Sequence, residues 1–314
     1  MKTSILYQYT KQMVKNQHYV PRFYLRGFVS HKQKIWCFDK VSGKSFQSSI
    51  LNLANENYFY DFDENDREQL VEKHLGEIET RFAPHLARLV KILHEQKFSY
   101  LDPILRSEIC RYMVYQIIRT REYRQEMSQV LEQMAQGIIG KGWMDIHEVK
   151  QRGLYTSSSD IKNMQGRSIL GLDKTLIKEE LYQVLNSHIW IIFENRTDRF
   201  LYCSDNPVVK VPHLHSPYYS MSGYQSLGIE INFPLSPFYC LGLFDRSQFF
   251  QYEESENLLL PLENPENIIY FNSLQVKNSY RQVYSYSEDF DIAQLVLKNQ
   301  PFYADTLRKR VEAG

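Results

Sequence analysis

Residues 188–195 read HIWIIFEN, and at this point the character of the sequence changes. The stretch is rich in β-branched and aromatic residues, as are the later runs RFLYCSDNPVVKV (199–211), IEINFPLSPFYCLGLF (229–244) and NIIYFNSLQVKNSYRQVYSYS (267–287). Proline, asparagine and glycine interrupt these runs, which is typical of short strands joined by turns. We therefore predict one mixed or antiparallel sheet, built mostly from the C-terminal half of the chain.

The part of the chain before residue 188 is predicted to be mainly helical. Apolar residues recur every three to five positions over residues 66–97, as they do on the buried face of a helix. A second long helix is predicted over residues 103–139, because Asp102 is a suitable N-cap and Pro103 suits the first turn. Pro84 is expected to kink or split the first helix, since it has no N–H group to donate.

Shorter elements complete the expected fold. KIWCFD at 34–39, followed by VSGKSF, predicts a β-hairpin, and residues 174–187 and 287–312 predict two more helices. Residues 141–170 are polar and serine-rich, which predicts a loop. The strand-like runs on either side of the Lys-Asn-Ser turn within FNSLQVKNSYRQVYS (271–285) predict a second hairpin.

Together these elements predict an α+β fold in a single domain, residues 1–314. A long helical hairpin forms an insertion at about 66–187, and the sheet-rich part spans about 188–286. The N-terminal hairpin is expected to join the same sheet, so that the helices lie between two parts of it.

The charge balance and the cysteines narrow the classes of function. Lysine plus arginine equals aspartate plus glutamate, at 37 each, so the whole protein has no net attraction to nucleic acid or to an anionic membrane, although a local basic cleft is compatible with this. The four cysteines are isolated, which argues against a zinc knuckle or a disulfide framework and suits a reducing, cytoplasmic location. The N-terminal segment lacks a signal-peptide pattern and no apolar stretch approaches ~18 residues, so no membrane partner is expected.

The segment NQHYVPRFYLRGF, residues 16–28, places His18 just before a predicted short helix. Pro21 favours an extended residue before it and suits the start of a helix over PRFYLRGF. The positive end of that helix favours a neutral imidazole, which can act as a base or bind a metal. The alternative is that His18 only braces the turn through a backbone contact. Three residues of the helix are expected to share a buried face: Tyr24, Leu25 and Phe28.

A second polar segment, LYCSDNPVVKV at 201–211, follows a predicted strand that ends at Cys203. Asp205 and Asn206 occupy the loop, and Pro207 keeps Asn206 out of the helical conformation. The two polar side chains could tie the backbone as Asx-turns. They could equally present a carboxylate and an amide to a cleft, where the carboxylate would be a general base or a metal ligand.

Several other polar residues could line such a cleft. Arg119 on the second long helix could contact a phosphate or belong to a solvated basic face. Asn272 and Arg281 lie on the polar side of the second predicted hairpin. His213 and His215 have a spacing that suits a metal on an extended strand, but prolines flank them, so a solvated loop is the simpler expectation.

Four segments taken together resemble a known family. QHYVPRFYLRGF, CSDNPVV, FPLSP and FNSLQVKNSYRQVYS occur in an order and spacing, from about residue 16 to 286, similar to those of an uncharacterised bacterial family, domain of unknown function 4238. The chain departs from the family pattern at Arg22, where glutamine is usual, and at Cys203, where threonine is common.

The resemblance implies a role in defence against phage, because members of that family are implicated in it. An effector of this kind, including one that acts by abortive infection, is inactive until a phage infects the cell. The resemblance also implies that His18, Asp205 and Asn206 form a joint site, because they are the polar residues of the family motifs.

Two classes of function are compatible with these residues. In the first, the protein is a nuclease-like hydrolase of RNA or DNA, with His18, Asp205 and Asn206 catalytic. Its substrate-binding residues would be Tyr19, Arg119, Asn272 and Arg281. In the second, the protein is a non-enzymatic sensor that binds a phage protein or another phage product.

Geometry separates the two classes. An enzyme requires His18 and Asp205 to converge in an open pocket, whereas a sensor would use the two motifs to hold the fold together. The sequence does not specify the substrate, the trigger, the oligomeric state or the cofactor, for which a divalent metal is one option.

Overall fold

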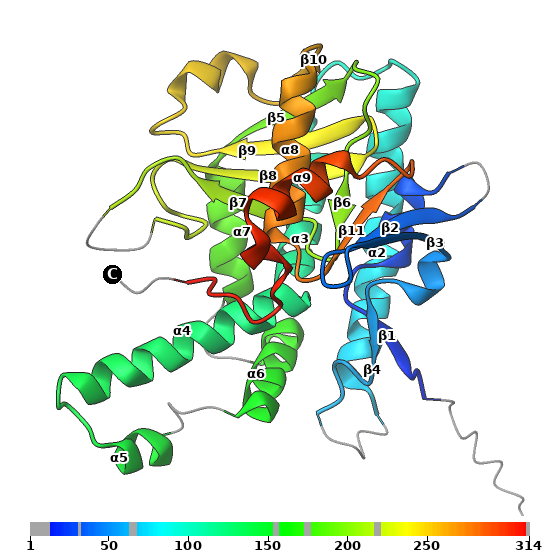
Figure 1. The fold of residues 1–314 in the computed structure, drawn as a ribbon. Coiled ribbons are helices and arrows are strands. Elements are labelled where there is room, and N and C mark those ends of the chain that lie inside the picture. Colours follow the sequence, from blue (N-terminus) through cyan, green and yellow to red (C-terminus); the bar gives the residue numbers. More distant parts are fainter. Residues whose placement is uncertain are drawn as a thin grey trace, which may run out of the picture.

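The computed structural model describes residues 13–30, 33–62, 68–152, 157–172, 177–216 and 221–311. At the centre of the fold is a mixed five-stranded sheet from the C-terminal half (Figure 1). Its order is β10-β5-β9-β8-β7, with β10 parallel to β5 and the other pairs antiparallel. The sheet confirms the predicted α+β class. Its strands are β5 (Ile189–Asn195), β7 (Val209–Pro212), β8 (Ile229–Ser236), β9 (Tyr239–Phe244) and β10 (Leu259–Leu262).

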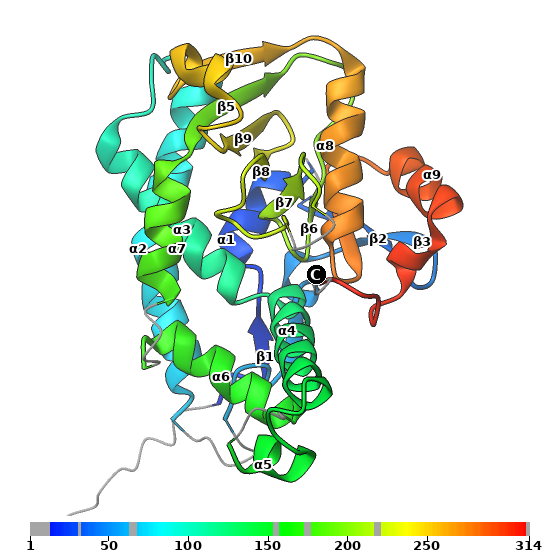
Figure 2. The same ribbon diagram turned by 90° about the vertical axis from the view of Figure 1, so that its left-hand side faces the viewer.

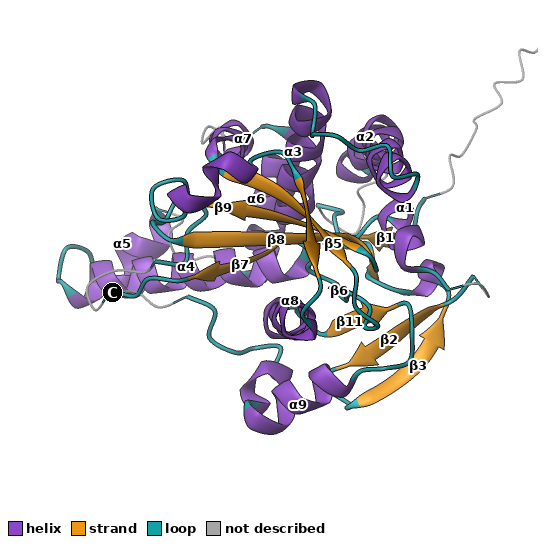
Figure 3. Cartoon of the chain, turned by 90° about the horizontal axis from the view of Figure 1, so that it is seen from above, coloured by secondary structure: helices purple, strands orange, loops and turns teal. Residues whose placement is uncertain are grey.

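Helices cover both faces of this sheet, as Figures 2 and 3 show. On one face lie α2 (Leu70–His94), α3 (Pro103–Ile118) and α7 (Ile177–Ser187), and on the other lies α8 (Pro265–Asn278). All residues of β8 are buried, because both of its faces are covered. The main apolar core takes residues from both halves of the chain, as a single domain would require.

A second sheet joins strands from the N-terminal and C-terminal parts of the chain. β2 (Ile35–Asp39) and β3 (Lys44–Ser48) form the predicted hairpin. β11 (Gln282–Ser285) pairs with β2 on one side and with β6 (Cys203–Ser204) on the other, and all the pairs are antiparallel. The sequence analysis expected the N-terminal hairpin to join the main sheet. It instead belongs to the second sheet, because β11 pairs with its inner strand.

The long helical hairpin is present, with one break that was not predicted. α2 runs through Pro84 without ending, and α3 packs against it. The helix predicted over 103–139 is two helices, α3 and α4 (Arg121–Gly140). Thr120 causes the break, because its Oγ1 accepts a hydrogen bond of 3.2 Å from the backbone N–H of Tyr123 and caps α4. The first residues predicted for the hairpin, 66 and 67, lie outside the described residues.

The polar segment 141–170 contains two helices where a loop was predicted. They are α5 (Ile146–Gln151) and α6 (Ser158–Leu170). Each begins with a capping box, Asp145 with Glu148 and Ser157 with Asp160. The serines that favoured a loop are thus part of a helix start. The helix predicted at 174–187 is confirmed as α7, and residues 174–176 lie outside the described ranges.

The hairpin predicted at 271–285 is wrong, because most of that segment belongs to α8. Asn264 caps this helix through a 3.0 Å hydrogen bond from the backbone N–H of Glu266, and Pro265 occupies its first turn. The aromatic and β-branched residues that favoured strands face the core from the helix. Only Gln282–Ser285 forms a strand.

Short elements complete the structure. β1 (Asn16–His18) pairs with β4 (Asn55–Asn57), and α1 (Arg22–Leu25) follows β1. As predicted, Tyr24, Leu25 and Phe28 are buried. α9 (Asp291–Asn299) occupies part of the predicted C-terminal helix. In the described ranges, no helix combines the length and the apolar character that a membrane span needs. Short 3₁₀-helices occur at Arg26–Phe28, Ile50–Asn52, Phe250–Ser255 and Pro301–Ala304.

Candidate functional site

The carboxylate of Asp205 holds the start of β11 in place. Oδ1 accepts a hydrogen bond from the backbone N–H of Tyr280 at 2.8 Å, and Oδ2 accepts two more, from Arg281 at 2.8 Å and Gln282 at 2.7 Å. The side chain is fully buried. Burial raises the pKa of Asp205, while these N–H groups and the ammonium group of Lys40 act in the opposite direction. Both carboxylate oxygens of Asp205 therefore bond to backbone, as the first of the two alternatives for this residue predicted.

The two asparagines of the predicted site also contact backbone. Nδ2 of Asn206 donates to the carbonyl of Asn278 at 3.0 Å. Asn272 is buried on α8, where Oδ1 accepts from the N–H of Tyr202 at 2.8 Å and Nδ2 donates to the carbonyl of Phe200 at 2.9 Å. Both side chains thus tie α8 to the segment around β6.

Arg281 and Tyr19 lie on the same side of the molecule as Asp205. Arg281 Nη2 lies 2.6 Å from Oδ2 of Asp39, and its side chain is 48% exposed. Burial raises the pKa of Tyr19 well above its usual value, and the charge of Asp205 contributes next. Among the described residues, no hydrogen bond or ion pair joins the side chain of His18 to that of Asp205.

His18 is half-buried at the end of β1. Its Nε2 lies 3.4 Å from Nδ2 of Asn55, its partner residue in β4. Burial and, after it, the charge of Arg22 lower the pKa of His18. The imidazole is therefore neutral near pH 7, as the sequence analysis expected. The main cause is burial, rather than the helix end that the sequence suggested.

Arg119 joins His18 to a carboxylate on α2. Nη2 of Arg119 donates to the carbonyl of His18 at 2.7 Å and to Oε1 of Glu79 at 2.8 Å. The side chain of Arg119 is only 2% exposed, and the hydroxyl of Tyr60 donates to its carbonyl at 2.9 Å. Arg119 is thus a buried brace and does not form a solvated basic face.

A second carboxylate, Glu72, lies on α2 two turns before Glu79. Residues seven positions apart lie on nearly the same face of a helix. The pKa of Glu72 is raised to about 7, chiefly by burial and also by the carboxylates of Glu79 and Asp61, while Arg119 and Arg22 act in the opposite direction. Glu72 is therefore partly protonated near neutral pH, which is unusual for a glutamate.

Arg22 is the exposed cation of this region. Its charge acts on the pKa of both His18 and Glu72. Its side chain forms no hydrogen bond or ion pair with any other residue that the structure describes, so its guanidinium is available to a ligand. We call the residues His18, Arg22, Glu72, Glu79 and Arg119 the His18 cluster.

The sequence analysis identified His18 and Arg119 of this cluster but missed the two glutamates. Glu72 and Glu79 stand more than fifty positions from His18, in a helix that the sequence analysis described only by its apolar residues. Their seven-residue spacing was the one available signal. Within the described ranges, no group of three or more histidine, cysteine, aspartate or glutamate side chains is arranged to hold a metal ion.

His18 and Glu72 share the charged neighbours Arg22, Glu79 and Arg119, and clusters of groups with shifted pKa values are candidates for a functional site. The chain belongs to the family described as "Protein of unknown function (DUF4238)", whose model matches residues 16–289. This confirms the family that the sequence analysis suggested. A comparison with curated proteins found no match, and neither did a comparison with solved structures.

Proposed function

We propose that the protein is an anti-phage effector that acts in the cytoplasm and cleaves RNA at the His18 cluster. One observation carries this proposal: an imidazole with a lowered pKa and a carboxyl group with a raised pKa share the neighbours Arg22, Glu79 and Arg119. Titratable groups whose pKa values are shifted in opposite directions supply a base and an acid at the same pH.

RNA is the substrate that uses such a pair most directly. Neutral His18 would take the proton of a ribose 2′-hydroxyl, and the resulting oxygen would attack the adjacent phosphorus. The bond from phosphorus to the 5′-oxygen breaks, and protonated Glu72 gives its proton to that oxygen. Arg22 would stabilise the charge on the phosphoryl oxygens. The products are a 2′,3′-cyclic phosphate and a free 5′-hydroxyl.

The place of this reaction in phage defence rests on the family resemblance. Cleavage of cellular or phage RNA would stop phage production in an infected cell. Such an effector must be inactive before infection, and this agrees with a catalytic histidine that is half-buried.

The 2′-hydroxyl requirement tests the proposed reaction. The purified protein, with and without an extract of phage-infected cells, is incubated with an RNA oligonucleotide, its 2′-O-methyl counterpart and the matching DNA in the presence of EDTA. We expect cleavage of RNA alone, with a cyclic phosphate terminus identified by mass spectrometry. Equal cleavage of the 2′-O-methyl strand, or no cleavage under either condition, would contradict the reaction.

The Glu72→Gln substitution is expected to change the pH profile of cleavage. The wild-type rate should rise as His18 loses its proton, below pH 6.5, and fall as Glu72 loses its proton at about pH 7. Glutamine has no proton to donate in this range, so the rate should drop about 10²-fold and the high-pH decline should disappear. Glu77→Gln, at an exposed position of the same helix, is the matched control and should keep the wild-type profile.

Stability gives a second measure of the same group. The pKa of Glu72 is raised in the folded protein from 4.5 to about 7, so its favourable contribution is complete below pH 4.5 and is lost as the pH rises through 7. The Glu72→Gln protein should therefore unfold at higher urea concentration than the wild type at pH 8, and the difference should shrink at pH 5. An equal difference at both pH values would contradict the raised pKa.

A sensor of a phage product is the second candidate function. The observation that favours it is that Asp205, Asn206 and Asn272 make their hydrogen bonds with backbone, as residues that hold a fold together do. In that case purified protein would cleave no nucleic acid, and a phage product would bind it with the same affinity in the wild type and the Glu72→Gln variant.

A further inference from the structure

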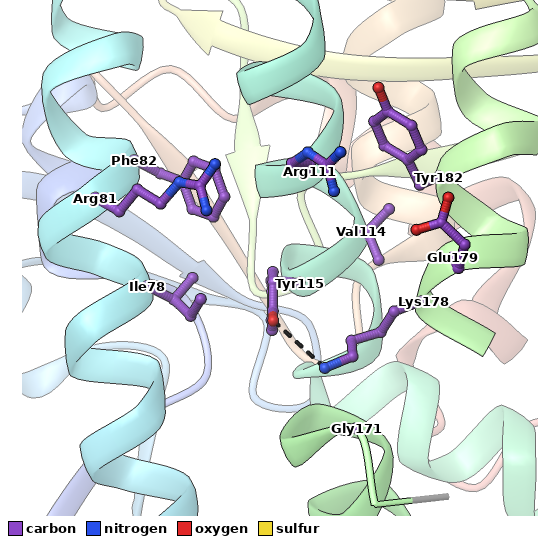
Figure 4. Close-up of a pocket in the computed structure, with 10 residues that line it drawn as sticks. All are labelled: Ile78, Arg81, Phe82, Arg111, Val114, Tyr115, Gly171, Lys178, Glu179 and Tyr182. Carbon is purple, nitrogen blue, oxygen red and sulfur yellow. Dashed lines mark hydrogen bonds between the residues drawn. The ribbon is translucent and has the colours of Figure 1, made fainter. Parts of the chain in front are cut away.

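A cavity of about 250 Å³ lies between α2, α3 and α7, outside the His18 cluster (Figure 4). Its walls carry three cationic side chains, one from each helix: Arg81, Arg111 and Lys178. The rim carries one carboxylate, Glu179, whose Oε1 accepts a hydrogen bond of 2.7 Å from Gln183 on the same helix. The lining is therefore positive overall.

Arg81 is neutralised within the protein, but Arg111 is not. Nη2 and Nε of Arg81 donate to Glu108 at 2.7 and 3.1 Å. The guanidinium of Arg111 lies over the ring of Tyr182, 4.4 Å from its centre. Among the residues that the structure describes, Arg111 has no hydrogen-bond or ion-pair partner. Its donors are thus available to an anion in the cavity.

Lys178 supplies a second donor at the opposite end of the cavity. Its Nζ donates to the carbonyl of Ile169 at 2.9 Å and to the hydroxyl of Tyr115 at 3.4 Å, as Figure 4 shows for the second contact. Nε2 of His74 lies 3.3 Å from that hydroxyl. The amino group therefore has a fixed position that faces the cavity.

The remaining walls are apolar and aromatic. Ile78 and Phe82 from α2 face Val114 from α3, and the rings of Tyr115 and Tyr182 complete the lining. Such a surface accepts the face of a flat ring. The volume is below the ~300 Å³ at which cavities for drug-sized ligands begin, so a ligand with one ring system and one anionic group fits it best.

We propose that this cavity binds a small organic anion with a flat ring, held by Arg111 and Lys178 through its anionic group and by Ile78 and Phe82 through its ring. Two sources share this chemistry, a nucleoside monophosphate and an aromatic carboxylate. The ligand would contact the turn of α3 that precedes Arg119, whose backbone N–H donates to the carbonyl of Tyr115 at 3.1 Å. The proposal does not depend on cleavage of RNA.

Calorimetric titration of the full chain with defined probes tests the proposal. The probes are AMP, GMP, indole-3-carboxylate and inorganic phosphate. We expect one class of ring-bearing anion to bind saturably with one ligand per chain, and inorganic phosphate to bind at least about tenfold more weakly. Binding of the nucleotides identifies a phosphate ligand, and binding of the carboxylate identifies an aromatic acid.

Two variants assign the binding to this cavity. Arg111→Ala removes the unpaired guanidinium, and Ile78→Phe fills the space without a change in charge. Each substitution should lower the affinity for the probe by about tenfold or more and leave the circular dichroism spectrum unchanged. Arg88→Ala is the control, because Arg88 lies on the same helix with its side chain 61% exposed, and it should keep wild-type affinity. Failure of every probe, phosphate binding as tight as the best probe, or wild-type affinity in both cavity variants would overturn the proposal.

Discussion

Replacement of His18 by alanine is expected to lower the rate of RNA cleavage by ~10²–10⁴-fold, the usual contribution of a general base. The protein should remain folded with a modest loss of stability, because most of the structural contacts of His18 are made by its backbone. The carbonyl accepts the hydrogen bond from Arg119, and the strand pairing with Asn55 also uses backbone groups. The side chain contributes one hydrogen bond with the backbone of Ile50 and one long contact, 3.4 Å from Nδ2 of Asn55.

His85→Ala is the matched control for this experiment. His85 lies on α2, its side chain is 32% exposed, and it stands 3.9 Å from Glu108. Cleavage rate and melting temperature are measured for both variants in parallel. A well-folded His18→Ala protein with the wild-type rate would end the catalytic interpretation. A rate that falls only in proportion to the folded fraction would make His18 a structural residue.

Replacement of Asp205 by alanine is expected to lower the free energy of unfolding by at least ~3 kcal/mol. Three backbone N–H groups would lose their buried acceptor, at ~1 kcal/mol or more each. The substitution also removes the negative charge that supports Lys40, whose pKa burial lowers to about 7. Urea denaturation measures the change directly.

Asn206→Ala, one residue further along, is the control for Asp205. It removes a single hydrogen bond to the carbonyl of Asn278 and should lower the free energy of unfolding by only ~1 kcal/mol. At low temperature, where both variants are folded, each should cleave RNA at the wild-type rate. A stable but inactive Asp205→Ala protein would restore the catalytic role that the sequence suggested for this residue.

The sequence predicted correctly those elements whose pattern of apolar residues matches the way the element is buried in the fold. The run around Trp190 is continuously apolar, because both faces of β5 are covered. The strand could therefore be recognised from the sequence. The helix α8 could not, because Phe271 and Val276 reach the core from a helix and read equally well as strand residues. At Ser157 the same residue type marks a loop or a helix cap, and only the Asp160 carboxylate decides between them.

The candidate site was predicted only in part, because a local pattern marks some of its residues and tertiary contacts define the others. His18 stands out because a proline-bounded motif surrounds it. The role of Asp205 depends on whether three N–H groups from a distant strand reach it, and no local pattern contains that information. Glu72 acquires its raised pKa from burial beside Glu79 and Asp61, which is a property of the packed helix and not of its sequence.

The pairing of β2 with β11 has a consequence for protein synthesis. Asp39 lies opposite Gln282, so the first hairpin can pair with its neighbouring strand only after synthesis has passed residue 285. Contacts so distant in sequence form late and leave a nascent chain exposed. A translation product interrupted before Tyr280 would have neither that strand nor the donors for Asp205. The second sheet and the buried position of Asp205 are therefore completed together, by one late segment of the chain.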